Sequence, residues 1–282
     1  MGLNSLQTDA FLAIARTQSF SEAAKQLHVT QSALSQRINN LESDLGQTLF
    51  IRKSSGILPT EAGRKFLKYC QIKSSLEEEL IQNIKGKKTG EFGGTLRLAA
   101  YSSVMRSVIM PALLPFLRKH PGVQCEFITQ NIRLPDLLQR SEVDFIVMDH
   151  PFSSLGVQTK SLGHEVYIAV ESEKYDSPDD IYLDNDPTDM ATEIFFAAQE
   201  NVPKYRRSYF SDVYGILNGV SAGLGRAVVS KHLIKPNTPV RVLKKYHSLK
   251  VEVSLHYHDQ PFYSQLHSEV IEQLVKNCPQ FL

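Results

Sequence analysis

The feature that most constrains the fold is a change of pattern at residues 86–94. This segment, GKKTGEFGG, holds four glycines and two lysines in nine positions, which is typical of a flexible, solvated hinge. Before it, apolar residues recur at helical spacing, and after it, short apolar runs alternate with helical patterns. The 282-residue chain is therefore expected to be an α+β multidomain protein, with a helix-rich head and a separate α/β body.

Composition narrows the class of protein. Hydrophobic residues make up 42% and charged residues 22%, an ordinary soluble composition, and no apolar run approaches the length of a membrane span. The first residues lack the basic stretch and apolar core of a secretory signal. The three cysteines lie far apart without a CxxC pair, which favours a reducing compartment. We therefore expect a cytoplasmic protein without a membrane partner.

Charge is distributed unevenly along the chain. Residues 1–90 hold 12 Lys and Arg against 8 Asp and Glu, a net charge of +4, whereas the remainder holds 19 against 22, a net charge of −3. A basic segment joined to a slightly acidic body indicates two tasks, one of which can face a polyanion. A chance distribution of charge is the alternative.

The head shows two helices spaced as a helix-turn-helix. A first helix begins near Ser5, Ser21 is expected to cap a short helix through EAAKQLH, and Thr30 caps the next, QSALSQRINNLESDL. The gap of about three residues between the last two suits a helix-turn-helix. Apolar residues at intervals of four, three and four are expected to face inward: Leu34, Ile38, Leu41 and Leu45.

The opposite face of this helix is polar and nearly uncharged. It carries Gln31, Ser32, Ser35, Gln36 and Asn39. Amides and hydroxyls both donate and accept hydrogen bonds, which suits base edges in a major groove, and Arg37 on the flank can reach phosphate. An ordinary solvated helix face is the alternative.

The next stretch, LFIRKSSGILPT, predicts a strand, a turn and a second strand. Arg52 and Lys53 lie beside the turn, where two cations can neutralise backbone phosphates. A solvated turn with the same residues is the alternative.

Residues 19–63 resemble the winged helix-turn-helix of LysR-type transcriptional regulators. The matching positions are Ala23, Ala24, Leu27, Gln31, Ala33, Leu34, Ser35, Ile38, Leu41, Glu42, Leu45, Gly46, Leu49, Phe50, Arg52, Thr60, Glu61, Ala62 and Gly63. Ser32 departs from the proline of many members, and the order Gln36-Arg37 is often reversed. The arrangement resembles the subgroup that senses basic amino acids for export.

The resemblance implies a double-stranded DNA-binding domain over residues 1–60. Its expected contacts with DNA are Thr30, Gln31, Ser32, Ser35, Gln36, Arg37, Asn39, Arg52 and Lys53. Thr60 caps a long helix over 61–86 whose apolar positions approach a coiled-coil seam. The resemblance makes this the dimerisation helix and implies a homodimer or homotetramer. A helix packed on its own domain is the alternative.

The body, residues 95–282 beyond a hinge at 87–94, reads as two groups of strands and helices. The expected strands are TLRLAA, VQCEFIT, VDFIVMD, EVYIAVES, EIFFAAQ and VEVSLHYH, and DVYGILNGVSAGLGRAVVS reads as a helix, a glycine stop and a further strand. A second lobe is expected at about 165–236, after which the last strand and helix return to the first lobe. This plan resembles the two-lobed α/β effector domain of the same family, which is similar to periplasmic solute-binding proteins.

A ligand in such a fold lies beyond the carboxyl ends of the strands. Polar residues that follow predicted strands are the expected effector contacts: Ser102, Ser103, Gln130, Asn131, Asp149 and Gln199. The mixture indicates a small polar or carboxylate metabolite.

Other chemistry finds weaker support in the sequence. GLGRAV at 223–228 follows a helix and does not match a dinucleotide loop, and Gly223 is better explained as a helix terminator. His256 and His258 share a strand face but lack a defined third metal ligand. Cys125 is expected to be a buried thiol. We therefore expect no enzyme, metal or cofactor; a solute-binding module and an enzyme with a DNA-binding appendage are the alternatives.

Overall fold

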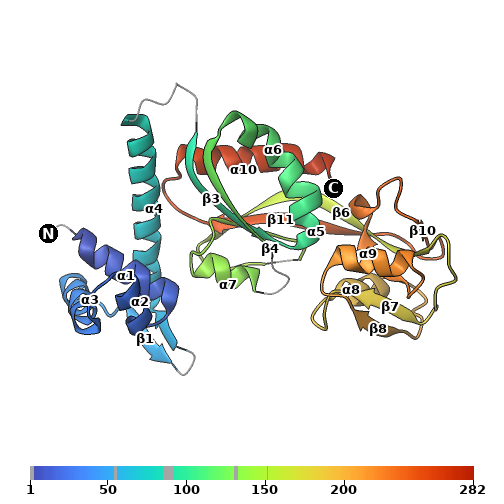
Figure 1. Cartoon of the computed structure of the whole chain (residues 1–282), viewed down its shortest axis with the longest axis horizontal. Coiled ribbons are helices and arrows are strands. Elements are labelled where there is room, and N and C mark those ends of the chain that lie inside the picture. Colours follow the sequence, from blue (N-terminus) through green and yellow to red (C-terminus); the bar gives the residue numbers. More distant parts are fainter. Residues whose placement is uncertain (1–2, 54–55, 85–91, 130–132, 151) are drawn as a thin grey trace.

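The computed structural model describes residues 3–53, 56–84, 92–129, 133–150 and 152–282. The helical head packs around the lower end of the upright helix α4 (Glu61–Ile84), and the two-lobed α/β body lies to the right of this helix (Figure 1). This arrangement confirms the predicted fold class. Residues 87–91 of the predicted hinge lie outside the described residues.

The head is a helix-turn-helix followed by a β-hairpin. Its elements are α1 (Ser5–Thr17), α2 (Phe20–Gln26), α3 (Gln31–Leu45), β1 (Phe50–Lys53) and β2 (Gly56–Pro59). The two strands pair antiparallel, as the sequence predicted. Phe11 of α1 stacks on Phe50 at 4.8 Å and meets Phe66 of α4 edge-on, so one core joins the helices, the hairpin and α4.

The helix starts follow the capping residues of the sequence. Thr30 accepts a hydrogen bond from the Ala33 N–H at 3.2 Å, as expected for the cap of α3. The cap of α2 is Ser19, whose hydroxyl accepts from the Glu22 N–H, and the expectation of Ser21 was wrong. The helix begins two residues earlier because Phe20 can then pack edge-on against the wing residue Phe50.

Helix α4 is capped at its start, and its second half carries exposed apolar side chains. The Thr60 hydroxyl accepts from the Gly63 N–H at 3.0 Å, which satisfies one of the open donors of the first turn. Several apolar side chains farther along are substantially exposed in the single chain: Leu76, Leu80, Ile81 and Ile84. The Gln71 side-chain amide donates to the Ser141 carbonyl at 3.3 Å, so the middle of α4 also contacts the body.

Lobe I of the body is a sheet covered on both faces. Its strands are β3 (Gly93–Ala100), β4 (Gly122–Thr129), β5 (Phe145–Met148), the first part of β6 (Val157–Ser172) and the second part of β11 (Leu249–His258). Strands β3, β4 and β5 are parallel, and β11 returns antiparallel beside β5.

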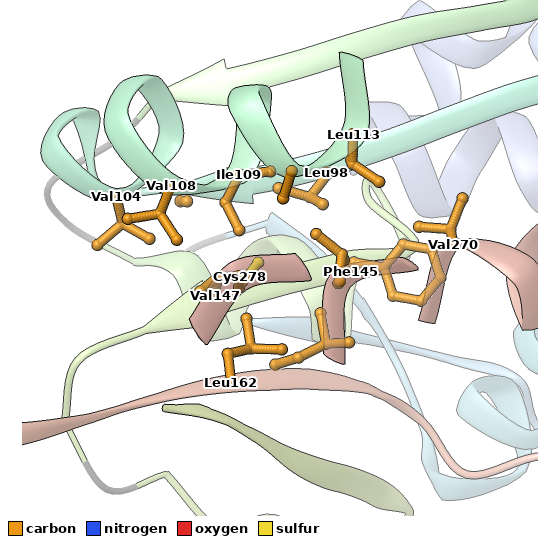
Figure 2. Close-up of a cluster of buried hydrophobic side chains, with 14 of the residues drawn as sticks. Leu98, Val104, Val108, Ile109, Leu113, Phe145, Val147, Leu162, Val270 and Cys278 are labelled. Carbon is orange, nitrogen blue, oxygen red and sulfur yellow. The ribbon is translucent and has the colours of Figure 1, made fainter. Parts of the chain in front are cut away.

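Helices bury the apolar side chains of this sheet. One face is covered by α5 (Ser102–Val104), η1 (Met105–Ile109), α6 (Met110–Lys119) and α10 (Gln265–Asn277), and the other by α7 (Leu134–Gln139). Figure 2 shows Val108 and Ile109 of the helical segment lying over Leu98, Phe145 and Val147 of the strands. The segment η1 is a π turn within an otherwise α-helical run.

Lobe II is built around the far end of the same sheet. Its further elements are β7 (Ile181–Asp184), α8 (Ala191–Ala197), β8 (Arg206–Tyr209), α9 (Val213–Ser221), β9 (Ala227–Ser230), η2 (Lys231–Leu233) and β10 (Val240–Val242). β9 and β10 pair with β6, whereas β7 and β8 form a separate parallel pair. β6 and β11 run through both lobes as one antiparallel ladder.

Three local expectations were wrong, for EIFFAAQ, Leu45 and Cys125. EIFFAAQ forms helix α8 with Phe195 and Phe196 buried, because a short apolar run fits either a strand or a buried helix. Leu45 is 38% exposed at the end of α3, where the core has ended. Cys125 is exposed because β4 is the edge strand of the sheet. Gly223 has a φ of +78° directly after α9, which agrees with its predicted role.

Among the described residues, no helix combines the length and apolar content that crossing a membrane requires.

Candidate functional site

The outer face of α3 is open to solvent. Gln31, Ser32, Gln36 and Asn39 are exposed, and Ser35 and Arg37 are half-buried. The opposite face is fully used by the core, since Leu34, Ile38 and Leu41 are buried. The predicted contact residues on α3 therefore lie on the surface of one helix.

Local hydrogen bonds order this face while leaving polar groups at the surface. The Ser32 and Thr30 hydroxyls lie 3.0 Å apart, and the Gln36 amide donates to the Asn40 side-chain oxygen at 2.8 Å. These bonds restrain exposed side chains before any partner arrives, which lowers the entropy cost of binding. The surface can offer amide and hydroxyl groups of both polarities to a base edge.

The wing is tied to α3 by a carboxylate. Glu42 accepts hydrogen bonds from the Leu49 N–H at 2.6 Å and the Phe50 N–H at 3.3 Å, so the first strand of the wing starts at a fixed place beside the helix. Arg52 is exposed, and its guanidinium lies 5.9 Å from the centre of the Phe20 ring. The side chain of Lys53 lies outside the described part of the structure.

A second candidate site is a cavity of about 380 Å³ between the two lobes. The lobe I wall is formed by Tyr101, Ser102, Ser103, Asp149 and His150. The opposite wall includes residues 185, 186 and 188–191, with Val213, Ile216 and Ser230, and the crossing strands contribute Tyr167 and Val251. The volume suits a small metabolite.

Asp149 lines this cavity with a partly buried carboxylate. Its carboxylate accepts from the Tyr167 hydroxyl at 2.7 Å and lies 3.2 Å from the His150 ring nitrogen. Burial opposes ionisation, but the hydrogen bonds from His150 and Tyr167 outweigh it and lower the pKa of Asp149. The nearby charge of Asp149 adds to burial in raising the pKa of Tyr167, which keeps that hydroxyl a donor.

A loop from lobe II adds two carboxylates, Asp186 and Asp189. The Asp189 side chain accepts from the Asn185 amide at 2.8 Å and from the Ala191 N–H at 2.9 Å. The described lining of the cavity contains three aspartates and no lysine or arginine. Its electrostatic field therefore favours a ligand with a positive group.

Arg207 holds this loop in place through its backbone carbonyls. Its guanidinium pairs with Asp184 and Glu193 and donates to the backbone carbonyls of Asp186 and Asp189. Side-chain exposure is 14% for Arg207 and 1% for Asp184. One arginine thus holds four acceptors, which sets the path of the chain between β7 and α8.

Only some of the predicted effector contacts line the cavity. Ser102, Ser103 and Asp149 line the cavity together. Gln130 and Asn131 lie outside the described residues. Gln199 lies away from the cavity, where its side chain exchanges two 2.9 Å hydrogen bonds with the backbone of His247. It does not lie at the carboxyl end of a strand because EIFFAAQ is a helix.

Sequence reasoning missed most of the lobe II wall. The sequence shows the acidic residues Asp184, Asp186 and Asp189, but it gives no clear signal for the short strand IYLD that ends in Asp184. Tyr167 was placed on a strand without a role. A strand that ends in a cluster of acidic residues is the signal that could have found this wall.

The two histidines considered for metal binding are engaged otherwise. The His256 ring lies 2.9 Å from the Thr159 hydroxyl, and the His258 ring lies 2.7 Å from the Leu138 carbonyl. Within the part of the chain that the structure describes, no three His, Cys, Asp or Glu side chains gather as metal ligands.

Two family models match this chain. Residues 6–64 match the family described as "Bacterial regulatory helix-turn-helix protein, lysR family", and residues 89–279 match the "LysR substrate binding domain". The uncharacterised regulator YcgK of Bacillus subtilis is 31% identical over 163 residues, a match that covers 57% of this chain and 50% of YcgK. The chain thus spans about half the length of that relative.

Solved structures share the complete architecture. LysG from Corynebacterium glutamicum, described as full-length with bound effector Arg, has a TM-score of 0.75 at 19% identity, with 99% of both chains covered. ArgP from Mycobacterium tuberculosis has a TM-score of 0.76 at 19% identity, with 97% of both chains covered. At this identity the likeness shows the fold, while the two family matches together span most of the sequence. The chain belongs to the LysR family.

Proposed function

We propose that the protein is a cytoplasmic transcriptional regulator that binds double-stranded DNA through its head and a small effector through its cleft. The observation that carries this function is the exposed amide-and-hydroxyl face of α3 beside the exposed Arg52 of the wing. In this division, residues 1–60 bind DNA, 61–86 dimerise, 87–94 form the hinge and 95–282 bind the effector.

The head contacts DNA by two kinds of interaction. Gln31, Ser32, Ser35, Gln36 and Asn39 read base edges in the major groove, where paired donors and acceptors distinguish the base pairs. Thr30, Arg37, Arg52 and Lys53 contact the phosphate backbone and fix the position of α3 on the duplex.

The protein assembles as a homodimer or homotetramer through α4. Leu76 and Ile84 are 48% and 75% exposed in the single chain, and a second copy of the helix can cover them. Two-fold pairing would present two α3 helices to one operator with matching half-sites.

The effector carries a positive group and a carboxylate. The three cavity aspartates supply the site for the cation. Ser102 and Ser103 lie at the start of the helical segment over residues 102–119, and a helix start with hydroxyl groups suits the anion. LysG, which has this fold, is described with arginine as its bound effector, and arginine has both charges. The cleft binds this molecule without turnover, so the protein is not an enzyme.

Alanine at both Arg52 and Lys53 should weaken binding to every duplex and lower the salt dependence of log K by about one to two units.

Gln31→Ala should instead reduce the preference for a selected operator over random DNA by about 1–3 kcal/mol. Fluorescence anisotropy with an operator selected from random duplexes, measured over a salt series, checks both results. Arg118→Ala, an exposed change in the body, is the control. Equal losses on operator and random DNA for Gln31→Ala would contradict base reading.

Asp149→Asn should weaken L-arginine binding by about 1.5–3 kcal/mol, the usual contribution of a hydrogen bond to a charged group, which is roughly 10-fold to 150-fold in Kd. Calorimetric titration of L-arginine, L-lysine and the uncharged analogue L-citrulline checks the required charge. Asp176→Asn, an exposed change outside the cavity, should leave Kd unchanged. Tighter binding of citrulline than of arginine would contradict a cation site, and product formation during incubation would support the enzyme alternative.

A further inference from the structure

A chain of hydrogen bonds connects the two lobes directly behind the cleft. The Ser107 hydroxyl of η1 lies 2.9 Å from Nδ1 of His232, which follows β9 in lobe II. Nε2 of the same ring lies 3.0 Å from the Glu165 carboxylate on the crossing strand β6. The imidazole therefore uses both nitrogens, one toward each lobe.

This chain is buried and firmly held. The exposure of the His232 and Glu165 side chains is 4% and 1%. The Ser230 hydroxyl donates to the same Glu165 oxygen, and the Ser107 hydroxyl also bonds to the Ser103 carbonyl. Buried polar networks that are satisfied in this way favour one arrangement of the elements that carry them.

The ends of the chain reach opposite walls of the cavity. Ser103 lines the cavity from lobe I, and Ser230 lines it from lobe II. The neighbouring residue on η1, Arg106, adds a second contact between the lobes, since its guanidinium lies 4.9 Å from the centre of the Tyr214 ring of α9. π turns inside α-helices are frequent at functional sites, and here the turn presents consecutive side chains to lobe II.

We propose that Ser107, His232 and Glu165 are positioning residues that form a clasp, which fixes the spacing between the two walls of the cleft. Ser107 supplies the link from lobe I, and the His232–Glu165 pair supplies the receiving side. The lobes then separate only when the Ser107–His232 bond breaks, while β6 and β11 bend.

The clasp also lies within reach of the charge in the cleft. Glu165 and Tyr167 are two residues apart on β6 and share a face, and Tyr167 bonds to Asp149. Burial and the nearby Asp149 charge raise the pKa of Glu165, whereas its bonds to His232 and Ser230 oppose that rise. A ligand cation on Asp149 would relieve this repulsion and strengthen the Glu165–His232 pair. This coupling, unlike the clasp itself, rests on the proposed effector function.

Ser107→Ala removes the hydrogen bond from lobe I to His232 and keeps the His232–Glu165 pair. Nitroxide labels at Glu272→Cys on α10 and Lys204→Cys in lobe II, both exposed positions, report the separation by pulsed electron paramagnetic resonance. Cys125→Ser removes the exposed native thiol, and dilution with unlabelled chain leaves only pairs within one chain. Without ligand, the population at longer distances should rise about 2-fold to 10-fold in Ser107→Ala, the range for one lost hydrogen bond.

Ser221→Ala is the matched control. Like Ser107, Ser221 donates a hydrogen bond from its hydroxyl to the backbone carbonyl four residues earlier, at 2.7 Å, but this bond lies entirely within lobe II. Its distance distribution should equal that of the unmutated protein. An unchanged distribution in Ser107→Ala would overturn the clasp. Added L-arginine should narrow the distribution of the unmutated protein; failure of arginine to bind would contradict the effector proposal and leave the ligand-free comparison valid.

Discussion

Arg207→Met is expected to destabilise lobe II by about 3–5 kcal/mol, because it leaves the buried carboxylate of Asp184 without its cation. The same change releases Glu193 and the carbonyls of Asp186 and Asp189, so the acidic wall of the cleft loses its support. Hydrogen exchange at the amides of β7 and α8 measures the local free energy of opening. This local measurement is preferable because one melting curve does not describe the separate domains of a multidomain chain.

The adjacent residue supplies the control for this change. Arg206 pairs with Asp180 at 2.9 Å, but its side chain is 73% exposed, so Arg206→Met should cost at most about 1 kcal/mol. Similar losses for the two variants would contradict the role assigned to Arg207.

The deficit of Arg207→Met should also depend on pH. Burial raises the pKa of Asp184 even with Thr192 and Arg207 opposing it, and removal of Arg207 should raise it further. A carboxyl whose folded pKa lies above its unfolded pKa stabilises the fold below the unfolded value and loses that contribution as pH rises. The deficit should therefore be smaller near pH 4 than near pH 8, and the reverse order would contradict an uncompensated carboxylate.

Gly63→Ala is expected to destabilise the head by about 3 kcal/mol or more. A Cβ at this position would lie 2.1 Å from the Leu49 carbonyl oxygen and 3.1 Å from the Pro59 Cβ. The first of these atoms belongs to the backbone, so the start of α4 would have to move away from the wing. Urea unfolding of the full chain, monitored by hydrogen exchange at the amides of α1 and α3, measures the loss of stability of the head. Binding to the selected operator should weaken as the head loses stability.

Gly46→Ala separates crowding from backbone strain. Gly46 ends α3 with a φ of +63°, yet a Cβ there would meet no atom within 4 Å. The expected cost is about 1 kcal/mol, from the left-handed conformation alone. If Gly63→Ala cost no more than this, the close approach of α4 to the Leu49 carbonyl would be contradicted.

The head was largely predictable because its signals are local. Thr30 and Thr60 cap helices as expected, Leu34, Ile38 and Leu41 face inward, and the hairpin follows its turn residues. Ser21 and Leu45 were wrong because Phe20 packs on the wing and the core ends before the last turn of α3.

The cleft was only half predictable because its lobe II wall depends on distant partners. Ser102, Ser103 and Asp149 follow strands that the sequence shows clearly. Arg207, about 20 residues later, holds the carbonyls of Asp186 and Asp189, and no local pattern indicates this contact. Gln199 was misplaced by the incorrect strand at EIFFAAQ, and no local pattern indicates that Ser107 and His232 meet across 125 residues.

The shared ladder of β6 and β11 has a topological consequence. Residue 163 of the outgoing strand pairs with residue 253 of the returning one, so the chain leaves lobe I and re-enters it at adjacent points. Lobe II is thus an insertion into a hairpin, and the cut ends could be joined by a short turn. Exchange of this insert would replace the lobe II wall of the cleft and keep the lobe I wall with Ser102, Ser103 and Asp149, so one half of the ligand contacts is separable from the other.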